Sequence, residues 1–256
     1  MGYILVTNDD GVTAPGLLAL KQAMEKIAPV VVVAPDHNWS MSGHAKTMHK
    51  PLRVRKVKLA DGSDAFTSDG APTDCVAIVM LGLLGEKPAL VASGINPRVN
   101  LGQDLTYSGT VSAAMEGTIN DVPSLAVSID AEHDDGIDFS SAAEYAAKVA
   151  RRVLANGLPN GTLLNLNAPA IPVKDVRGVR ITRLGQRIYR DVLIERQDPQ
   201  GKNYYWIGGE PPTGVEDEGT DIWAVRHKFV SITPVHLDLT SHALIDPLKS
   251  WESEPL

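Results

Sequence analysis

Blocks of apolar residues repeat along the first two thirds of the chain. Short continuous apolar runs, typical of strands buried on both faces, alternate with stretches whose apolar residues fall at helical spacing. The expected strands cover residues 3–6, 30–34, 89–92, 124–129 and 162–166, and the expected helices cover residues 17–27, 75–84, 112–119 and 141–154. Leu52 and Val54 alternate with basic residues and predict a half-exposed strand. This order predicts an α/β fold with a doubly wound, mainly parallel sheet.

The last third of the chain has a different pattern. Beyond about residue 178 the segments are short, polar and strand-like, including residues 204–207 and 229–232. Residues 210–221 are rich in Pro, Gly and acid, which predicts an exposed loop. Strands that carry Trp206 and Trp223 without helices between them predict a β-hairpin appendage, a kind of element that often pairs with another subunit. We therefore expect one domain over residues 1–256, with a core over 1–177 and an oligomerisation region over 178–256.

Composition narrows the classes of function. The 256 residues are 43% hydrophobic, and 24 basic against 31 acidic residues give a net charge of −7, which argues against a broad nucleic-acid surface. The single cysteine, Cys75, excludes an internal disulfide and lies in an apolar run, so we interpret it as buried packing. No stretch has the pattern of a targeting signal or a membrane span. The expected location is the cytoplasm.

The candidate chemistry begins at Asn8-Asp9-Asp10-Gly11, directly after the first expected strand. Ligands bind at the carboxyl ends of parallel strands, and adjacent carboxylates need a positive partner. A hard divalent cation such as Mg²⁺ prefers carboxylate oxygen. Asn-Asp-Asp-Gly taken alone is equally typical of a turn.

Two further strand ends carry polar residues. The second strand is followed by Asp36, His37, Asn38 and Ser40, and the strand at 89–92 by Ser93-Gly94-Ile95-Asn96. In a parallel sheet these ends share one edge with Asp9 and Asp10. Oxygen ligands from Asp9, Asp10, Ser40 and Asn96 can then surround one Mg²⁺ or Mn²⁺.

Two small polar loops are candidates for holding a phosphate. Ser108-Gly109-Thr110 precedes a helical stretch, where free N–H groups and hydroxyls form an anion pocket or, equally, a simple helix cap. Ser42-Gly43-His44 adds possible donors, with His44 an acid, a phosphate donor or a plain loop histidine. The absence of a P-loop motif and of a Gly-x-Gly-x-x-Gly motif argues against an NTPase and against a dinucleotide-binding domain.

These segments together resemble the SurE family, the stationary-phase survival proteins that act as metal-dependent 5′/3′-nucleotidases. The matching segments are Val6–Gly11, Val33–Asp36, Gly70–Cys75, Ser93–Asn96, Thr106–Val111, Asn165–Pro169, Thr220–Val225 and Val230–Pro234. The resemblance implies a Rossmann-like core, a C-terminal region exchanged within a dimer or tetramer, and one divalent ion on Asp9, Asp10, Ser40 and Asn96. It implies hydrolysis of nucleoside monophosphates to nucleoside and phosphate.

Two positions depart from the family pattern. Trp39 precedes Ser40 where the family usually has a basic residue, and Arg98 follows Asn96 where small residues are more common. Arg98 can replace the positive charge missing at Trp39, and Trp39 can stack on a nucleobase.

The favoured mechanism is attack by water on a metal-bound phosphate, with Asn96, Ser108, Gly109 and Thr110 holding the other oxygens. Either Asp9 or Asp10 can accept the proton of the water. Two alternatives stay open: a covalent aspartyl-phosphate route, and a regulatory protein that binds nucleotides without turnover.

Overall fold

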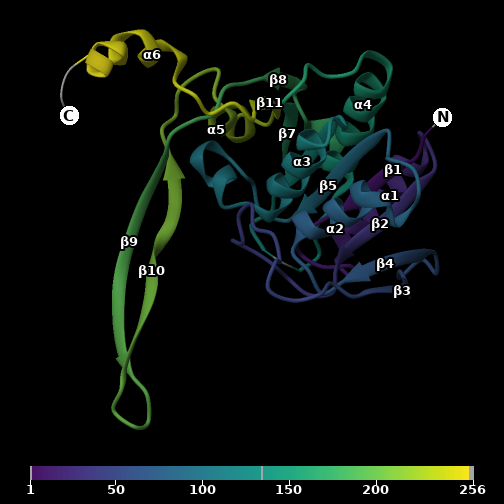
Figure 1. Cartoon of the computed structure of the whole chain (residues 1–256), viewed down its shortest axis with the longest axis horizontal. Helices are drawn as coiled ribbons and strands as arrows, with labels where there is room; N and C mark the ends of the chain where they lie inside the picture. The colour runs from purple at the N-terminus through teal and green to yellow at the C-terminus, as the bar shows by residue number, and fades with distance from the viewer. Residues whose placement is uncertain (1, 134, 254–256) are drawn as a thin grey trace.

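A nine-stranded mixed sheet forms the body of the molecule, and a separate two-stranded hairpin extends away from it (Figure 1). The computed structural model describes residues 2–133 and 135–253. The main sheet contains β1 (Ile4–Thr7), β2 (Val30–Pro35), β3 (Val54–Lys58), β4 (Asp64–Ser68), β5 (Leu90–Asn96), β6 (Ser124–Asp130), β7 (Thr162–Pro169), β8 (Val179–Ile181) and β11 (Val230–His236). Their spatial order is β3-β4-β2-β1-β5-β6-β7-β11-β8.

The centre of this sheet is parallel. β4, β2, β1, β5, β6 and β7 run in one direction, whereas β3 and β11 each pair antiparallel with a neighbour. The expected α/β class with a doubly wound, mainly parallel sheet is therefore confirmed. β4 was not expected from the sequence, because its alternation of exposed and buried residues covers only five positions.

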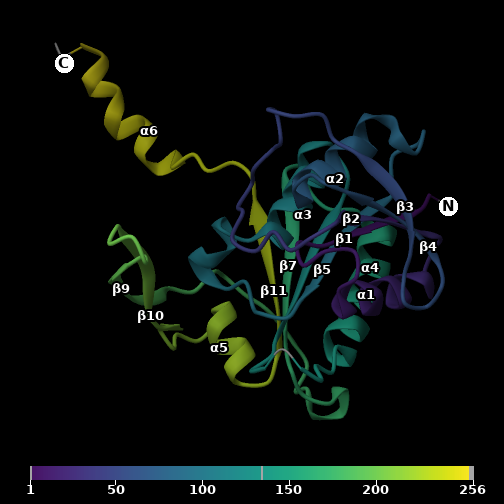
Figure 2. The same ribbon diagram turned by 90° about the horizontal axis from the view of Figure 1, so that it is seen from below.

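Helices cover both faces of the sheet (Figure 2). α1 (Pro15–Glu25) and α4 (Ser140–Asn156) lie on one face, and α2 (Pro72–Ile78) and α3 (Gly109–Ile119) lie on the other. The shorter helical segments are η1 (Val79–Leu83), η2 (Gly102–Thr106), η3 (Val173–Asp175), α5 (Asp221–Arg226), α6 (His242–Leu248) and η4 (Lys249–Ser253). Among the described helices, none combines the length and the apolar character that crossing a membrane requires.

The alternation of side chains along each strand divides the core into two layers. Ile4 and Val6 pack with the cluster under α1 and α4, while Leu5 packs with the cluster under α2 and α3. Both faces are apolar because both are covered, which explains the continuous apolar runs of the sequence. Cys75 lies in the second cluster, fully buried, and burial raises the pKa of its thiol, so it packs as expected.

The structure corrects the expectations for the last third of the chain. Residues 215–219 form the expected exposed loop, but residues 210–214 continue a strand, and Asp221 begins α5 and is fully buried. Trp223 lies on that helix, so a helix does separate the late strands. β8 and β11 add to the main sheet, although both lie beyond residue 177.

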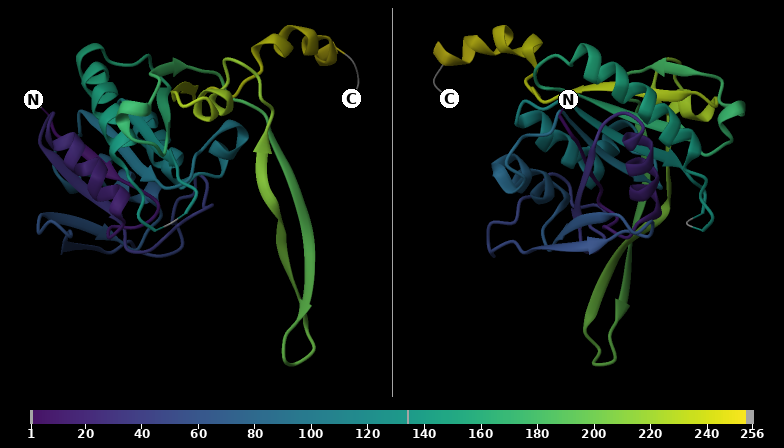
Figure 3. Two further views of the ribbon diagram at one scale, coloured as in Figure 1. Left: turned by 180° about the vertical axis from the view of Figure 1, so that it is seen from behind. Right: turned by 90° about the vertical axis from the view of Figure 1, so that its right-hand side faces the viewer.

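The hairpin consists of β9 (Arg187–Gln197) and β10 (Asn203–Gly214), which pair antiparallel. It projects from the body, and α6 lies beyond the body near the C-terminus (Figure 3). Both elements expose large apolar side chains: Val192, Leu193, Trp206 and Ile207 on the hairpin, and Leu244, Ile245, Leu248 and Trp251 near the C-terminus. The division of the chain into a core and an oligomerisation region stays a prediction.

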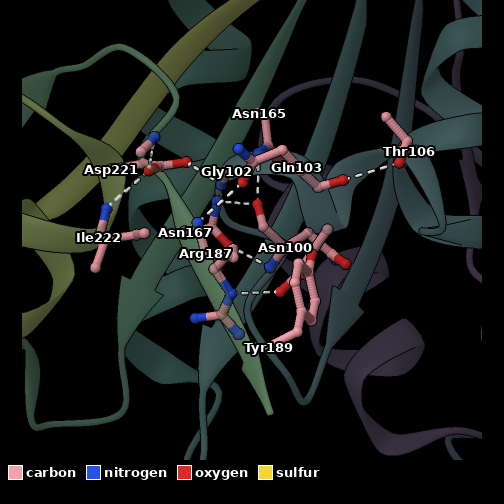
Figure 4. A network of polar contacts seen from close by, with 12 residues as sticks. Asn100, Gly102, Gln103, Thr106, Asn165, Asn167, Arg187, Tyr189, Asp221 and Ile222 are labelled. Atoms are coloured by element: carbon pink, nitrogen blue, oxygen red, sulfur yellow. Dashed lines mark hydrogen bonds and ion pairs between the residues drawn. The ribbon is translucent and has the colours of Figure 1, made fainter. Parts of the chain in front are cut away.

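Asp221 ties the base of the hairpin to η2 (Figure 4). Its Oδ2 accepts from the backbone N–H of Gly102 at 2.8 Å, and its Oδ1 accepts from the N–H groups of Gly185 and Ile222, each at 2.8 Å. Burial raises the pKa of Asp221, against the lowering effect of these three bonds. One carboxylate therefore satisfies buried donors from three separate segments.

We expect Asp221→Asn to lower the free energy of unfolding by about 2 kcal/mol, because the amide presents N–H to a buried N–H donor. Urea unfolding measures the loss. The matched control is Asp217→Asn, which removes an exposed partner of Arg183 and should change stability much less. Equal losses in the two variants would contradict this role.

Candidate functional site

The candidate site lies at the carboxyl edge of the parallel strands. β1 pairs parallel with β2 on one side and with β5 on the other, so the ends of all three strands meet at one edge, as the sequence predicted. A cleft of about 1670 Å³ opens there. Its lining includes Asp9, Asp10, Asn38, Ser40, Asn96 and Ser108 from the predicted site. The four predicted metal ligands therefore border a single space.

Asp9 is held against the start of α3. Its Oδ1 accepts from the Thr110 hydroxyl at 2.5 Å, and its carboxylate also accepts from the backbone N–H of Thr110. The side chain is only 4% exposed, and burial raises the pKa of its carboxyl despite these bonds. The partial positive charge at the helix start favours the carboxylate. A buried acid in this position gains further from a cation in the cleft.

Gly109 allows this close approach. A Cβ at position 109 would lie 2.7 Å from Cβ of Asp9 and 2.9 Å from its Oδ2. Ser108 caps the helix by accepting from the N–H of Val111 at 3.1 Å. The helix begins at Gly109, three residues before the expected start, because the capping serine is Ser108. The cap interpretation of this loop is confirmed, and the anion next to the helix start is the carboxylate of Asp9.

Asp10 and Asn96 lie half-buried at the cleft, and Ser40 lies exposed at its margin. The amide nitrogen of Asn96 donates to the carbonyl of Arg98 at 2.5 Å, which leaves its Oδ1 as the atom suited to a cation. Ser40 donates from its hydroxyl to Oδ1 of Asn38 at 2.6 Å. The loop that carries Ser40 is fastened to the first strand, because Trp39 N–H donates to the carbonyl of Asp9 at 2.8 Å.

The donor set fits a hard divalent cation. Two carboxylates, an amide oxygen and a hydroxyl are the oxygen ligands that Mg²⁺ and Mn²⁺ prefer. Three further polar atoms at the ends of β1 and β5 are buried and have no hydrogen-bond partner among the described residues: Thr7 Oγ1, Asn8 Oδ1 and Ser93 Oγ. Within the described part of the chain, no three His, Cys, Asp or Glu side chains gather to form a metal centre. A cation here therefore depends on neutral oxygen ligands as well as on acids.

Other predicted phosphate residues do not belong to the lining of the cleft. The hydroxyl of Thr110 is buried and donates to Asp9, so this side chain positions a carboxylate. Gly43 donates its N–H to the carbonyl of Tyr107, and Ser42 donates to that of Trp39. His44 lies 3.3 Å from Glu116, which also pairs with Lys46 at 2.7 Å. Ser42, Gly43 and His44 lie outside the lining of the cleft.

Glu116 is a buried acid for which no sequence motif predicts a role. It is 2% exposed on α3. Burial raises the pKa of Glu116, but the contacts with His44 and Lys46 outweigh it and lower the pKa overall. The contacts of Glu116 with His44 and Lys46 hold the 42–46 loop against α3. His44 is thereby engaged in a structural contact.

The structure also shows where the two residues that depart from the family pattern, Trp39 and Arg98, lie relative to the cleft. The ring of Trp39 lies 5.0 Å from that of His37, and Trp39 does not line the cleft. Arg98 does line it, and its guanidinium donates to the carbonyl of Ala131 at 2.5 Å. Arg98 thus brings positive charge to the cleft, while stacking of Trp39 on a base has no support in this geometry.

The opposite wall of the cleft comes from η2 and the base of the hairpin (Figure 4). Arg187 Nε donates to Oδ2 of Asp104 at 2.6 Å, and the Tyr189 hydroxyl donates to Oδ1 at 2.5 Å. Burial, followed by the contact with Asp104, raises the pKa of Tyr189 to about 12. Sequence reasoning missed this wall, because nothing local links residues 104 and 187.

Comparison with known proteins identifies the family to which the chain belongs. A family model described as "Survival protein SurE" matches residues 4–191. This chain belongs to the SurE family. It is 50% identical to a "5′-nucleotidase SurE" of Chloroflexus aggregans over 98% of this chain and 100% of that protein. It is 51% identical to a protein of the same name from Herpetosiphon aurantiacus, over 93% of each chain.

A solved structure agrees with the fold. The crystal structure of the SurE protein from Aquifex aeolicus matches with a TM-score of 0.84 and 42% identity, over 98% of this chain and 99% of that one. The family resemblance noted from the motifs is thus confirmed over nearly the whole chain.

We expect Gly109→Ala to lower the midpoint of thermal unfolding. Alanine favours a helix over glycine by up to about 1 kcal/mol, but the new methyl group would overlap Asp9. Scanning calorimetry of the wild type and the variant measures the change in this midpoint. A higher midpoint in the variant would show that Asp9 can move away without cost.

Proposed function

We propose that this chain is a divalent-metal-dependent 5′-nucleotidase that hydrolyses nucleoside monophosphates to nucleoside and phosphate. The observation that carries the proposal is the convergence of Asp9, Asp10, Ser40 and Asn96 on one cleft. The names of the relatives, which are 5′-nucleotidases of the SurE family, support the same substrate class. Hydrolysis of 3′-monophosphates belongs to the proposal as a second activity.

Asp9, Asp10, Ser40 and Asn96 would hold one Mg²⁺ or Mn²⁺ per subunit. When bound, such an ion polarises the phosphate, offsets charge that develops in the transition state and lowers the pKa of a bound water. The residues of the chain have their own tasks. Thr110 and the start of α3 keep Asp9 in one orientation, so that its carboxylate does not reorganise during the reaction.

The remaining phosphate oxygens need donors at the cleft. Ser108 lines the cleft, and Asn96 borders it at the end of β5. The start of α3 adds the backbone N–H of Gly109, and that of Thr110 would contribute only after leaving its contact with Asp9. The Ser42-Gly43-His44 loop would contribute only after leaving its contacts with Tyr107 and Glu116.

Asp10 is the better candidate to accept the proton of the attacking water. It borders the cleft and is half-buried, whereas Asp9 is enclosed by α3. A general base must lie within hydrogen-bond reach of the proton it accepts. The proposal assigns that role to Asp10 and a purely positioning and ligating role to Asp9.

The proposal includes an assembly and a location. The apolar side chains exposed on the hairpin and near the C-terminus support a homodimer or homotetramer formed through residues 178–256. The single buried cysteine is consistent with the reducing cytoplasm.

We expect the purified protein to release phosphate from adenosine monophosphate when Mn²⁺ or Mg²⁺ is present. A chelator should abolish the release, because without the ion nothing neutralises the two acids and the phosphate together. A colorimetric phosphate assay measures both. Nucleotide binding without turnover would instead favour the regulatory alternative.

Asp10→Asn is the informative variant in the same assay. It preserves size and should lower kcat by at least about a hundredfold while leaving the unfolding curve unchanged. Asp36→Asn, an exposed acid that does not line the cleft, is the control. Full turnover by Asp10→Asn would remove the proposed role.

We expect one turnover in heavy-oxygen water to place the label directly in the released phosphate. Direct water attack leaves the peptide that contains Asp9 and Asp10 unmodified throughout, whereas a covalent aspartyl-phosphate route passes through a phosphorylated peptide before water attacks its phosphorus. Mass spectrometry of the phosphate and of the peptide that contains Asp9 and Asp10 separates the two routes.

A further inference from the structure

The loop that carries Ser40 has no regular secondary structure of its own. It spans residues 36–53, between β2 and β3, and includes the polar segment Ser42-Gly43-His44. A loop of this length keeps one conformation only where contacts with the rest of the molecule hold it, because its backbone entropy opposes order. The contacts that hold this loop therefore decide where the Ser40 hydroxyl lies.

A β-turn places Ser40 at the cleft. Ser42 donates its N–H to the carbonyl of Trp39 at 3.2 Å. The turn encloses Ser40 and Met41, and both residues line the cleft. Met41 has a φ of 62° although it is not glycine, and it is 76% exposed, so packing of its side chain does not offset this backbone strain. The turn therefore depends on contacts of the residues on either side of it.

Backbone hydrogen bonds fasten the turn at both ends. At one end, Trp39 donates its N–H to the carbonyl of Asp9 at 2.8 Å. At the other end, Gly43 donates its N–H to the carbonyl of Tyr107 at 3.0 Å, directly before Ser108, the cap of α3. The residues that follow Gly43 are held by contacts with side chains.

Glu116 makes the side-chain contacts with these residues. It lies on α3 and is 2% exposed, and its carboxylate lies 2.7 Å from Nζ of Lys46 and 3.3 Å from Nε2 of His44. Asn120, at the end of α3, donates from its amide to Oε1 of Glu116 at 3.2 Å. A buried carboxylate needs cationic partners and hydrogen-bond donors. Among the described residues, both cationic partners of Glu116 come from the 42–46 loop.

The helix α3 thereby holds two of the candidate metal ligands. Thr110, near its start, donates to Asp9. Glu116, further along the same helix, holds the loop that follows Ser40. The position of the hydroxyl relative to the carboxylate thus depends on contacts with one regular element. Residues that orient the ligands of a metal change its affinity without touching it.

We propose that Glu116 is a positioning residue for the cation site: by holding the 42–46 loop, it keeps the Ser40 hydroxyl where it can bind a divalent cation. The inference rests on the proposed metal-dependent function and adds to it a residue that does not line the cleft. Because Glu116 acts through Ser40, its effect on the cation should vanish when residue 40 has no hydroxyl.

The test is a double-mutant cycle on the Mn²⁺ affinity of the full-length protein, measured by isothermal titration calorimetry without nucleotide. Glu116→Gln should weaken Mn²⁺ binding by about tenfold to a hundredfold, the range for residues that orient metal ligands. Ser40→Ala should weaken it at least as much. The two changes together should weaken it no more than Ser40→Ala alone, because both act on the same ligand. Unchanged affinity in Glu116→Gln, or factors that multiply in the double variant, would overturn the inference.

A variant on the loop side examines the same contact if Glu116→Gln fails to fold. Lys46→Met removes a partner of Glu116 whose side chain is 46% exposed, and it should weaken Mn²⁺ binding in the same direction. Met41→Gly favours the turn, because glycine adopts a positive φ without strain. Adding it to Lys46→Met should recover part of the lost affinity. Unchanged affinity in Lys46→Met, or no recovery on adding Met41→Gly, contradicts the inference.

Asp61→Asn is the matched control. It removes an ion-pair partner, 2.7 Å away, of the buried Lys21 on α1, and Asp61 does not line the cleft. This variant should lower the midpoint of thermal unfolding but leave Mn²⁺ affinity unchanged. An equal loss of affinity in the control would show that any lost ion pair loosens the site, and the inference would fall.

The inference and the proposed function fail on different results. Hydrolysis of adenosine monophosphate by the wild type, together with equal Mn²⁺ affinities in the wild type and Glu116→Gln, would overturn the inference alone. Weaker Mn²⁺ binding by Glu116→Gln, with no phosphate released from any nucleoside monophosphate by the wild type, would overturn the nucleotidase proposal alone.

Discussion

The buried carboxylate of Asp9 at the start of α3 is the contact on which the site depends. Thr110 donates to it at 2.5 Å, and Gly109 leaves room for it by lacking a side chain. Burial disfavours its charge, and the helix start together with the hydrogen bonds from Thr110 favours it. The same contact joins the end of β1 to α3. The position of Asp9 in the candidate site and the packing of α3 on the sheet therefore depend on the same contact.

Parallel strand order brings the rest of the cleft to this contact. Asp10, Asn96 and Asp130 come from β1, β5 and β6, and they meet because parallel strands present their carboxyl ends together. Asp104 closes the opposite side by holding Arg187 and Tyr189 of β9 (Figure 4). Asp221 fastens the same hairpin base to η2. The base of the hairpin is therefore fastened to η2, which ends two residues before Ser108.

Strand positions near the N-terminus were predictable because their apolar runs are continuous. The same rule, applied to the strand at 124–129, would have drawn attention to Asp130. The helix at α5 was not predictable, since six residues carry too little periodicity, and Trp223 resembles a strand residue. Ser42, Gly43 and His44 looked like phosphate donors, but their contacts with Tyr107 and Glu116 depend on residues distant in the chain.

The sequence by itself determined the class of fold, the family, and which polar residues follow the ends of the strands. Each of these follows from local order: apolar runs, helical spacing and the residues that come directly after a strand. Only the tertiary structure decided that the Thr110 hydroxyl donates to Asp9, and that Asp130 shares the cleft. Those outcomes depend on strand register and helix placement, which bring together residues as far apart as Asp9 and Thr110.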